Sequence, residues 1–277
     1  MSQIYVNSLH NAIVERNLAK VRRLVEAGRS IISSDGNFSL FHVAAQNNDV
    51  GIIKALSVSS TDVNTPMKVS GDTPMNFAAF YGHVSVIKAL SELGADVNTP
   101  NNDGVTPVYM AAKYGHVDAI KALFVLGADI NTPDRNGATP VYVAAENGHV
   151  DIVKVLGGLG ADVNTLNKGV SPMHAAAQLG HADVITALAD LGADVNMRGH
   201  GVTPLFVAAR TGRMDALKAL CAVGADIHAT DNEGVTPLGV AAGWGRVDVI
   251  KELSNLGADV NAADKNGATP VCMAAEN

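Results

Sequence analysis

The chain has 277 residues and a net charge of −7, and 47% of its residues are hydrophobic but only 4% aromatic. This hydrophobicity argues against an intrinsically disordered chain, and an acidic chain without a broad basic stripe is not expected to bind nucleic acid. Two cysteines, Cys221 and Cys272, give no disulfide framework, and no apolar stretch approaches the roughly 20 residues that cross a bilayer. We therefore expect a soluble, cytoplasmic protein that is not inserted into a membrane.

One dipeptide recurs along the chain at nearly constant spacing. It is Thr-Pro, with Ser-Pro once in its place, at Thr73-Pro74, Thr106-Pro107, Thr139-Pro140, Ser171-Pro172, Thr203-Pro204, Thr236-Pro237 and Thr269-Pro270. Successive pairs are 32 or 33 residues apart. A period this constant indicates stacked copies of one small structural unit.

Residues 137–165 show what one unit contains. Thr139 is expected to cap a helix whose first residue is Pro140, because proline has no N–H to leave unpaired there. Two adjacent alanines follow and would let another helix approach closely. A turn at Gly148 leads to a second helix with valine, isoleucine and leucine on one face, and Gly160 ends that helix.

A short helix pair of this kind cannot bury its apolar face alone. Stacking the pairs side by side closes that face, so the sequence predicts an all-α solenoid of stacked antiparallel helix pairs. The connections contain Asn-Gly and Asp-Gly pairs, for example Asn136-Gly137 and Asp103-Gly104. These pairs favour tight turns, so we expect short β-hairpin loops between the units.

The repeated pattern G-x-T-P-x-x-x-A-A-x-x-G-H, followed by a second helix and G-A-D-(V/I)-N, resembles the ankyrin repeat. This resemblance implies a curved stack whose concave face and hairpin tips bind other proteins. It predicts a single ankyrin-repeat domain, 1–277, with repeats at approximately 1–34, 35–68, 69–101, 102–134, 135–166, 167–198, 199–231, 232–264 and, in part, 265–277.

The two end repeats depart from the pattern. The first lacks Thr-Pro and is rich in charged residues such as Arg22, Arg23 and Glu26, which suit a capping repeat with one face in water. The last begins at Gly267 and stops at Asn277, where its first helix should end. We expect either that the natural chain continues or that another molecule covers this end. A second copy of the chain, associated end to end, could be that molecule.

Histidines recur after glycine in four repeats, at His83, His116, His149 and His181. Stacked helices lie about 8–10 Å apart, whereas ligands that share a zinc ion lie about 2 Å from it. These histidines therefore cannot form one metal site, and we expect them to hold the turn between helices. No set of nucleophile, base and orienting acid stands out, so we predict no catalytic residue, metal or cofactor, and no enzymatic activity.

The residues that follow the two alanines differ from repeat to repeat. In ankyrin repeats this position lines the concave face together with the hairpin tips, and aromatic and arginine side chains are common anchors of interfaces. The alternative is that these side chains only cover neighbouring helices. The predicted protein-binding residues are Phe80, Tyr81, Asp103, Lys113, Tyr114, Arg135, Glu146, Arg210, Glu233 and Trp244.

Two further positions carry predictions. In the T-P-L-H motif of the family the fourth position is histidine, and in this chain only His42 and His174 match it. We expect the residues at this position to serve mainly in packing, with Tyr109 and Tyr142 partly exposed. In ankyrin-repeat proteins the hairpin asparagine of D-(V/I)-N is a possible hydroxylation site, although a hydrogen bond to the hairpin backbone also explains it. The candidates are Asn98, Asn131, Asn164, Asn196 and Asn261.

The sequence thus predicts a non-enzymatic scaffold or adaptor, a monomer that binds a protein or peptide on its concave face and hairpin tips. One alternative is a targeting or regulatory segment of a larger enzyme or channel, and another is a structural spacer. A spacer should have a bland variable face, which the cluster of Phe80, Tyr81 and Tyr114 contradicts.

Overall fold

The computed structural model describes residues 10–27, 37–58 and 62–275. Within these residues the regular secondary structure is helical. The chain divides into an N-terminal unit, residues 1–135, and a C-terminal unit, residues 136–277, each of which is described by itself.

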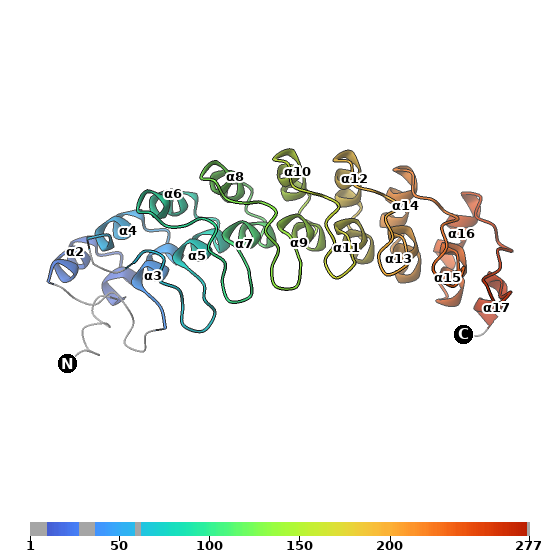
Figure 1. Ribbon diagram of the computed structural model, residues 1–277, viewed down its shortest axis with the longest axis horizontal. Helices are drawn as coiled ribbons and strands as arrows, with labels where there is room; N and C mark the ends of the chain where they lie inside the picture. The colour runs from blue at the N-terminus through green and yellow to red at the C-terminus, as the bar shows by residue number, and fades with distance from the viewer. Residues whose placement is uncertain (1–9, 28–36, 59–61, 276–277) are drawn as a thin grey trace. The chain divides into compact units, whose positions relative to one another are not determined.

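The N-terminal unit consists of two layers of short helices. The inner layer contains α3 (Leu40–Gln46), α5 (Pro74–Phe80) and α7 (Pro107–Lys113). The outer layer contains α2 (Leu18–Glu26), α4 (Val50–Leu56), α6 (Val84–Glu92) and α8 (Val117–Val125). Within this unit α3 packs on α5 and α5 packs on α7, and each of these inner helices also packs on the outer helix of its own pair (Figure 1).

The C-terminal unit repeats the same two layers. Its inner layer contains α9 (Pro140–Glu146), α11 (Pro172–Leu179), α13 (Pro204–Thr211), α15 (Pro237–Gly243) and α17 (Pro270–Ala275). Its outer layer contains α10 (Val150–Gly158), α12 (Ala182–Asp190), α14 (Met214–Ala222) and α16 (Val247–Asn255). The expected all-α ankyrin-type arrangement of helix pairs is confirmed within each unit (Figure 1).

The predicted helix start is confirmed at the Thr-Pro pairs. The Thr73 hydroxyl accepts a hydrogen bond from the backbone N–H of Asn76 at 3.3 Å, and Thr139 accepts the same bond from Tyr142 at 3.3 Å. Both threonines are buried, so their hydroxyls need these partners, and the proline that follows each one occupies the first helical position.

The paired alanines are fully buried, as a close approach between helices requires. Ala78, Ala79, Ala144 and Ala145 are all 0% exposed. Because the side chain is only a methyl group, neighbouring helices of seven or eight residues can approach closely enough to close the core.

The recurring histidines hold successive repeats together, which confirms their structural role. His83 Nε2 lies 3.1 Å from the Gln46 carbonyl oxygen, and His116 Nε2 lies 2.8 Å from that of Phe80. In the C-terminal unit, His181 Nε2 lies 3.1 Å from the Glu146 carbonyl oxygen. Each ring thus binds a carbonyl at the C-terminus of the preceding inner helix, where helical partners are missing.

Arginine replaces histidine in the later repeats without loss of this bond. Arg213 Nε donates to the Gln178 carbonyl at 3.1 Å, and Arg246 Nε donates to the Arg210 carbonyl at 3.1 Å. The position therefore requires an N–H donor of suitable reach, and a metal ligand is not required.

The loops between repeats form hairpin-like fingers rather than strands in the described residues. Isolated antiparallel bridges join Asn167 to Val170 and Gly199 to Val202. Elsewhere a side chain closes the turn, as where the Asn101 Oδ1 accepts from the backbone N–H groups of Asp103 and Val105 at 2.9 and 3.0 Å.

The expectation that Tyr109 and Tyr142 are partly exposed is wrong, because they are only 7% and 8% exposed. The Tyr109 hydroxyl reaches the finger, where it donates to Asp134 Oδ2 at 3.3 Å. The Tyr142 hydroxyl forms a hydrogen bond with the Asn167 side chain. The pKa of Tyr142 is raised, and the largest cause of this shift is the burial of the ring. A long side chain at this position therefore satisfies its polar tip in the next finger while its ring is buried.

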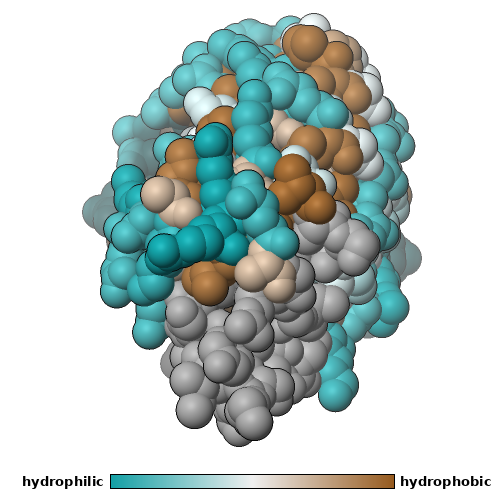
Figure 2. All heavy atoms as spheres, turned by 90° about the vertical axis from the view of Figure 1, so that its left-hand side faces the viewer, coloured by the Kyte–Doolittle hydropathy of each residue, from teal (hydrophilic) through white to brown (hydrophobic). Residues whose placement is uncertain are grey.

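The described part of the first repeat, residues 10–27, has the polar surface expected of a cap. Val21 and Val25 of α2 are buried, whereas Arg22, Arg23 and Glu26 are exposed. Figure 2 faces this end of the N-terminal unit and shows hydrophilic residues over much of the described surface, with separate apolar groups between them.

Candidate protein-binding surface

Four of the predicted binding residues meet at the C-terminal ends of α5 and α7. Phe80 ends α5, and Tyr81 follows it; Lys113 ends α7, and Tyr114 follows it. Tyr81 is 37% exposed and Tyr114 is 43% exposed. The same position of the repeat pattern therefore presents side chains of two adjacent repeats on one surface.

The three aromatic rings, Phe80, Tyr81 and Tyr114, form one cluster, which we call the aromatic patch. The centroids of Phe80 and Tyr114 lie 4.2 Å apart with planes inclined by 53°. The centroids of Phe80 and Tyr81 lie 4.7 Å apart in an edge-to-face arrangement. Contacts between aromatic rings stabilise them beyond their buried area, so the three rings support one another across the two repeats.

Polar groups fix the rim of the aromatic patch. The Gln46 side-chain amide donates to the Tyr81 hydroxyl at 3.1 Å, from the preceding inner helix. The Tyr81 ring stacks on His83, with centroids 5.7 Å apart. The Lys113 ammonium lies 5.9 Å from the Tyr114 ring centroid, within cation–π range. The patch thus has apolar faces and hydrogen-bonding edges, as interface anchors usually have.

Two predicted residues of the N-terminal unit lie on the fingers. Asp103 and Arg135 are exposed at successive finger tips, and the Arg135 backbone N–H donates to the Asp103 carbonyl at 2.9 Å. The fingers are therefore joined by their backbones, and both charged side chains remain available to solvent.

A small pocket of about 170 Å³ lies next to the aromatic patch. Its walls are Phe80 and Tyr81 of the patch together with Asp72, Asn76, Phe77 and Met110. Asp72, Phe77 and Met110 are not among the surface residues predicted from the sequence. The sequence does contain a sign that Asp72 is unusual. The residue before the Thr-Pro or Ser-Pro dipeptide is valine or alanine in the other six repeats that have it, whereas here it is the charged Asp72.

In the C-terminal unit the predicted residues are spread over separate repeats. Glu146 and Glu233 are exposed, Arg210 is partly exposed and Trp244 is 60% exposed. Among the described residues of this unit, no aromatic ring packs against Trp244. The structure therefore does not bring these four side chains into a cluster like the aromatic patch.

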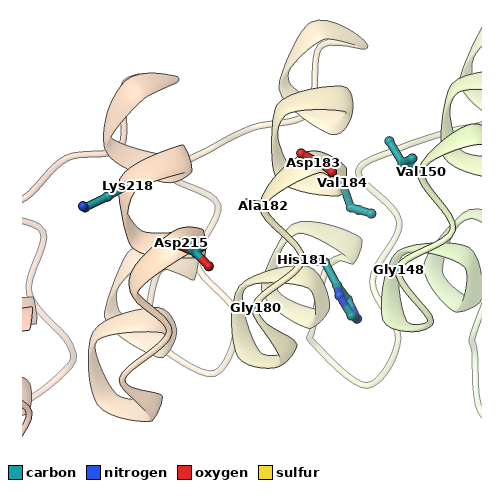
Figure 3. Close-up of a pocket in the computed structure, with 9 residues that line it drawn as sticks. All are labelled: Gly148, Val150, Gly180, His181, Ala182, Asp183, Val184, Asp215 and Lys218. Atoms are coloured by element: carbon teal, nitrogen blue, oxygen red, sulfur yellow. The ribbon is translucent and has the colours of Figure 1, made fainter.

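A larger open pocket of about 600 Å³ lies on the outer layer of the C-terminal unit, beside the starts of α12 and α14. Figure 3 shows the His181 side chain pointing from the start of α12 toward the loop of Gly148. Its ring is occupied by the bond to the Glu146 carbonyl. The rest of the lining consists of glycines, small apolar residues and the charged residues Asp183, Asp215 and Lys218, so we assign no binding chemistry to this pocket.

Metal-binding and membrane features are not evident in the residues that the structure describes. Over residues 10–27, 37–58 and 62–275, no group of three or more His, Cys, Asp or Glu side chains is placed to hold a metal ion. No helix in the same residues combines the length and apolar character needed to span a bilayer.

The hairpin asparagines join successive repeats. The Asn98 side chain accepts from the Asp129 backbone N–H at 2.8 Å and donates to the Gly127 carbonyl at 3.2 Å. Asn164 makes the same pair of bonds to Asp194 and Gly192, at 2.8 and 3.5 Å. A structural role thus accounts for these asparagines, and their hydroxylation, like that of Asn131, Asn196 and Asn261, stays a prediction.

Helix pairs that repeat every 32 or 33 residues and are connected by fingers define a repeat protein, and the family comparison identifies which kind. One family model, described as ankyrin repeats (3 copies), matches residues 41–134, 95–167, 123–199, 157–231 and 205–277. The chain belongs to the ankyrin-repeat family. Among solved structures, it is similar to the crystal structure of the human ASB11 ankyrin repeat domain, with a TM-score of 0.66 and 31% sequence identity, covering 73% of this chain and 92% of that chain.

A comparison with curated proteins found no match. Ankyrin repeats are generally protein–protein interaction modules, and their fold is typically non-catalytic. Membership of the family therefore supports protein binding as the class of function and leaves the partner to be found.

Proposed function

We propose that this chain is a non-enzymatic adaptor that binds a protein partner through the aromatic patch and the adjoining fingers of its N-terminal unit. The observation that carries this proposal is the contact between Phe80, Tyr81 and Tyr114, which exposes tyrosine rings that neighbouring side chains already hold in place. Ordered aromatic side chains lose little conformational entropy on binding, and they often dominate interface energies.

The charges around the aromatic patch add specificity to the proposed interface. Lys113 lies at its edge, and Asp103 and Arg135 lie on the finger tips. Charges at the rim of an interface affect the association rate and the choice of partner more than the total affinity. We propose that these three residues orient the partner and that the aromatic rings hold it.

The C-terminal unit supplies further contacts in this proposal. Trp244 is a large exposed ring, and Glu146, Arg210 and Glu233 vary where neighbouring repeats are otherwise alike. Because these side chains are dispersed, we propose that each adds a local contact and that the unit has no single anchor of its own.

The test is quantitative affinity capture with the tagged chain and with a Tyr81→Ala/Tyr114→Ala double variant. A matched control is Phe124→Ala/Val125→Ala, which also shortens two exposed apolar side chains of the N-terminal unit, 39% and 83% exposed, but on the outer helix α8. Thermal unfolding of all three proteins verifies that they are folded.

We expect the wild type and the α8 control to capture the same partners in equal amounts. The double tyrosine variant should capture roughly tenfold less of them or even less, as expected when interface anchors are removed. Recovery of the same partners at the same strength by all three proteins would contradict the assignment of the patch. The absence of any specific partner would favour the structural spacer instead.

A further inference from the structure

The pocket beside the aromatic patch is built from residues that break the repeat pattern. Asp72 stands where other repeats have Val105, Ala138 or Val170, and Phe80 stands where they have Lys113 or Glu146. Phe77 is the one aromatic residue at a place otherwise filled by methionine, valine or alanine in the repeats with this dipeptide. The common scaffold requires none of the three, so their meeting in one pocket needs another explanation.

The walls of the pocket are aromatic and are held from behind. Phe77 packs edge-to-face on His42, with centroids 5.2 Å apart, and its centroid lies 6.4 Å from that of Tyr81. Phe80 packs on Tyr81 in turn. Both phenylalanines and Met110 are partly accessible, so the pocket of about 170 Å³ opens to solvent between an apolar wall and the base of a finger.

The base of that finger supplies a carboxylate with one occupied oxygen. Asp72 Oδ1 accepts from the Asn101 side-chain amide at 2.7 Å. The backbone carbonyl of Asp72 lies 2.9 Å from His42 Nε2, so the residue is fixed through both its backbone and its side chain. Among the described residues, Asp72 Oδ2 has no hydrogen-bond donor.

We propose that this pocket binds the side chain of a lysine that the protein partner presents. Aromatic faces attract cations, and the carboxylate adds an opposite charge at the pocket's polar end. An arginine pairs best with both oxygens of a carboxylate at once, whereas a lysine ammonium is a compact point charge. Because Asn101 already occupies one oxygen of Asp72, the site fits an ammonium better than a guanidinium.

The same arrangement accounts for the rest of a lysine side chain. Its four methylene groups would lie along Phe77 and Met110, and its ammonium would donate to Asp72 Oδ2 beside the rings. Burying a charged group is favourable only where a partner compensates its lost hydration, and the pocket places the carboxylate where that compensation is needed. This inference rests on the proposed protein-binding function and specifies the chemistry of its partner.

The experiment is a selection of random heptapeptides displayed on phage against the full chain, followed by calorimetric titration of the enriched peptide. Three versions of that peptide are compared, with lysine, arginine or Nε-acetyl-lysine, which is neutral and one acetyl group larger, at the enriched position. The protein variants are Asp72→Asn, which keeps the oxygen that Asn101 binds, and Asp118→Asn, an exposed charge control on the outer helix α8.

The proposal predicts one conserved lysine in the enriched peptides and a loss of affinity of roughly tenfold or more with acetyl-lysine or with Asp72→Asn, as expected when a hydrogen-bonded charge is removed. Arginine should bind more weakly than lysine, and Asp118→Asn should bind as the wild type does.

The outcomes separate the two proposals. Enriched peptides that carry no lysine and lose affinity with Tyr81→Ala/Tyr114→Ala, but not with Asp72→Asn, would overturn the lysine site and leave the protein-binding function standing. Equal affinity for lysine and acetyl-lysine would also overturn it. If no peptide is enriched over the double tyrosine variant, both the lysine site and the aromatic patch are wrong.

Discussion

The rings of Phe80 and Tyr114 are in contact across two adjacent repeats, with centroids 4.2 Å apart. Phe80 ends α5 and Tyr114 follows α7, so this contact also joins two inner helices of the N-terminal unit. The patch that we assign to partner binding is therefore part of the packing between repeats.

A double-mutant cycle measures this contribution to stability. We expect Phe80→Ala and Tyr114→Ala each to lower the free energy of unfolding, with a coupling energy of about 0.5–1.5 kcal/mol between them, because either change removes the same ring contact. Urea denaturation of the wild type, both single variants and the double variant gives the coupling. Strictly additive effects would show that the two rings do not interact in solution.

Ala144→Leu tests the close approach of the inner helices. Ala144 is 0% exposed in α9, so the larger side chain should overpack the core and lower stability by roughly 1–3 kcal/mol. The control is Ala222→Leu, at the exposed last residue of α14 in the same unit. An unchanged denaturation midpoint for Ala144→Leu would contradict the helix contact assigned to the paired alanines.

His174 should make stability depend on pH. The pKa of His174 lies below its ordinary value of 6.5, mainly because the side chain is buried. The nearby His200 lowers the pKa of His174 by a smaller amount. As the pH falls through about 6.5, the unfolded chain binds a proton that the folded chain does not, so stability declines until the pH passes below the folded pKa.

A natural control for this prediction exists in the third repeat. Asn76 occupies the equivalent position, binds the Thr73 backbone and hydroxyl, and donates to the Val105 carbonyl at 3.2 Å. His174→Asn should therefore retain the cap and lose its share of the pH dependence. Urea denaturation between pH 7.5 and 5.5 measures it, and an identical slope for wild type and variant would show that His174 is not buried in its neutral form.

The two glycines of α10 should respond differently to alanine. A Cβ at Gly158 would meet no atom within 4 Å, whereas one at Gly157 would lie 2.4 Å from Leu191 Cδ1. We expect Gly158→Ala to stabilise the protein by about 0.5–1 kcal/mol through helix propensity, and Gly157→Ala to gain less because Leu191 must move. Thermal and urea unfolding compare the pair, and a larger gain at Gly157 would be inconsistent with the packing of α10 on α12.

The repeat positions fixed by the backbone were predictable from sequence. Thr139 as a cap and Ala144 as a contact residue follow from local rules that a helix start and a close helix approach impose. The burial of Tyr109 was not predictable, because it depends on Asp134, which lies in the next finger and meets the hydroxyl only after stacking.

The candidate site was predictable only where a single repeat position identifies its residues. Tyr81 and Tyr114 differ from their counterparts at a position known to vary, so the sequence pointed to them. The pocket was missed because Asp72 and Met110 come from different repeats and only the stacked structure places them on the same cavity. Departures from the repeat at apolar places, such as Asp72, were the available signal.

Site-specific photo-cross-linking at position 81 tests the central claim most directly. Tyr81 is replaced by p-benzoylphenylalanine, which is also aromatic, and a second protein carries the same replacement at Val125 on the outer helix α8. We expect a covalent adduct with a partner protein from position 81 and none with that partner from position 125. An adduct with the same partner from position 125 alone would contradict the aromatic patch as the binding surface.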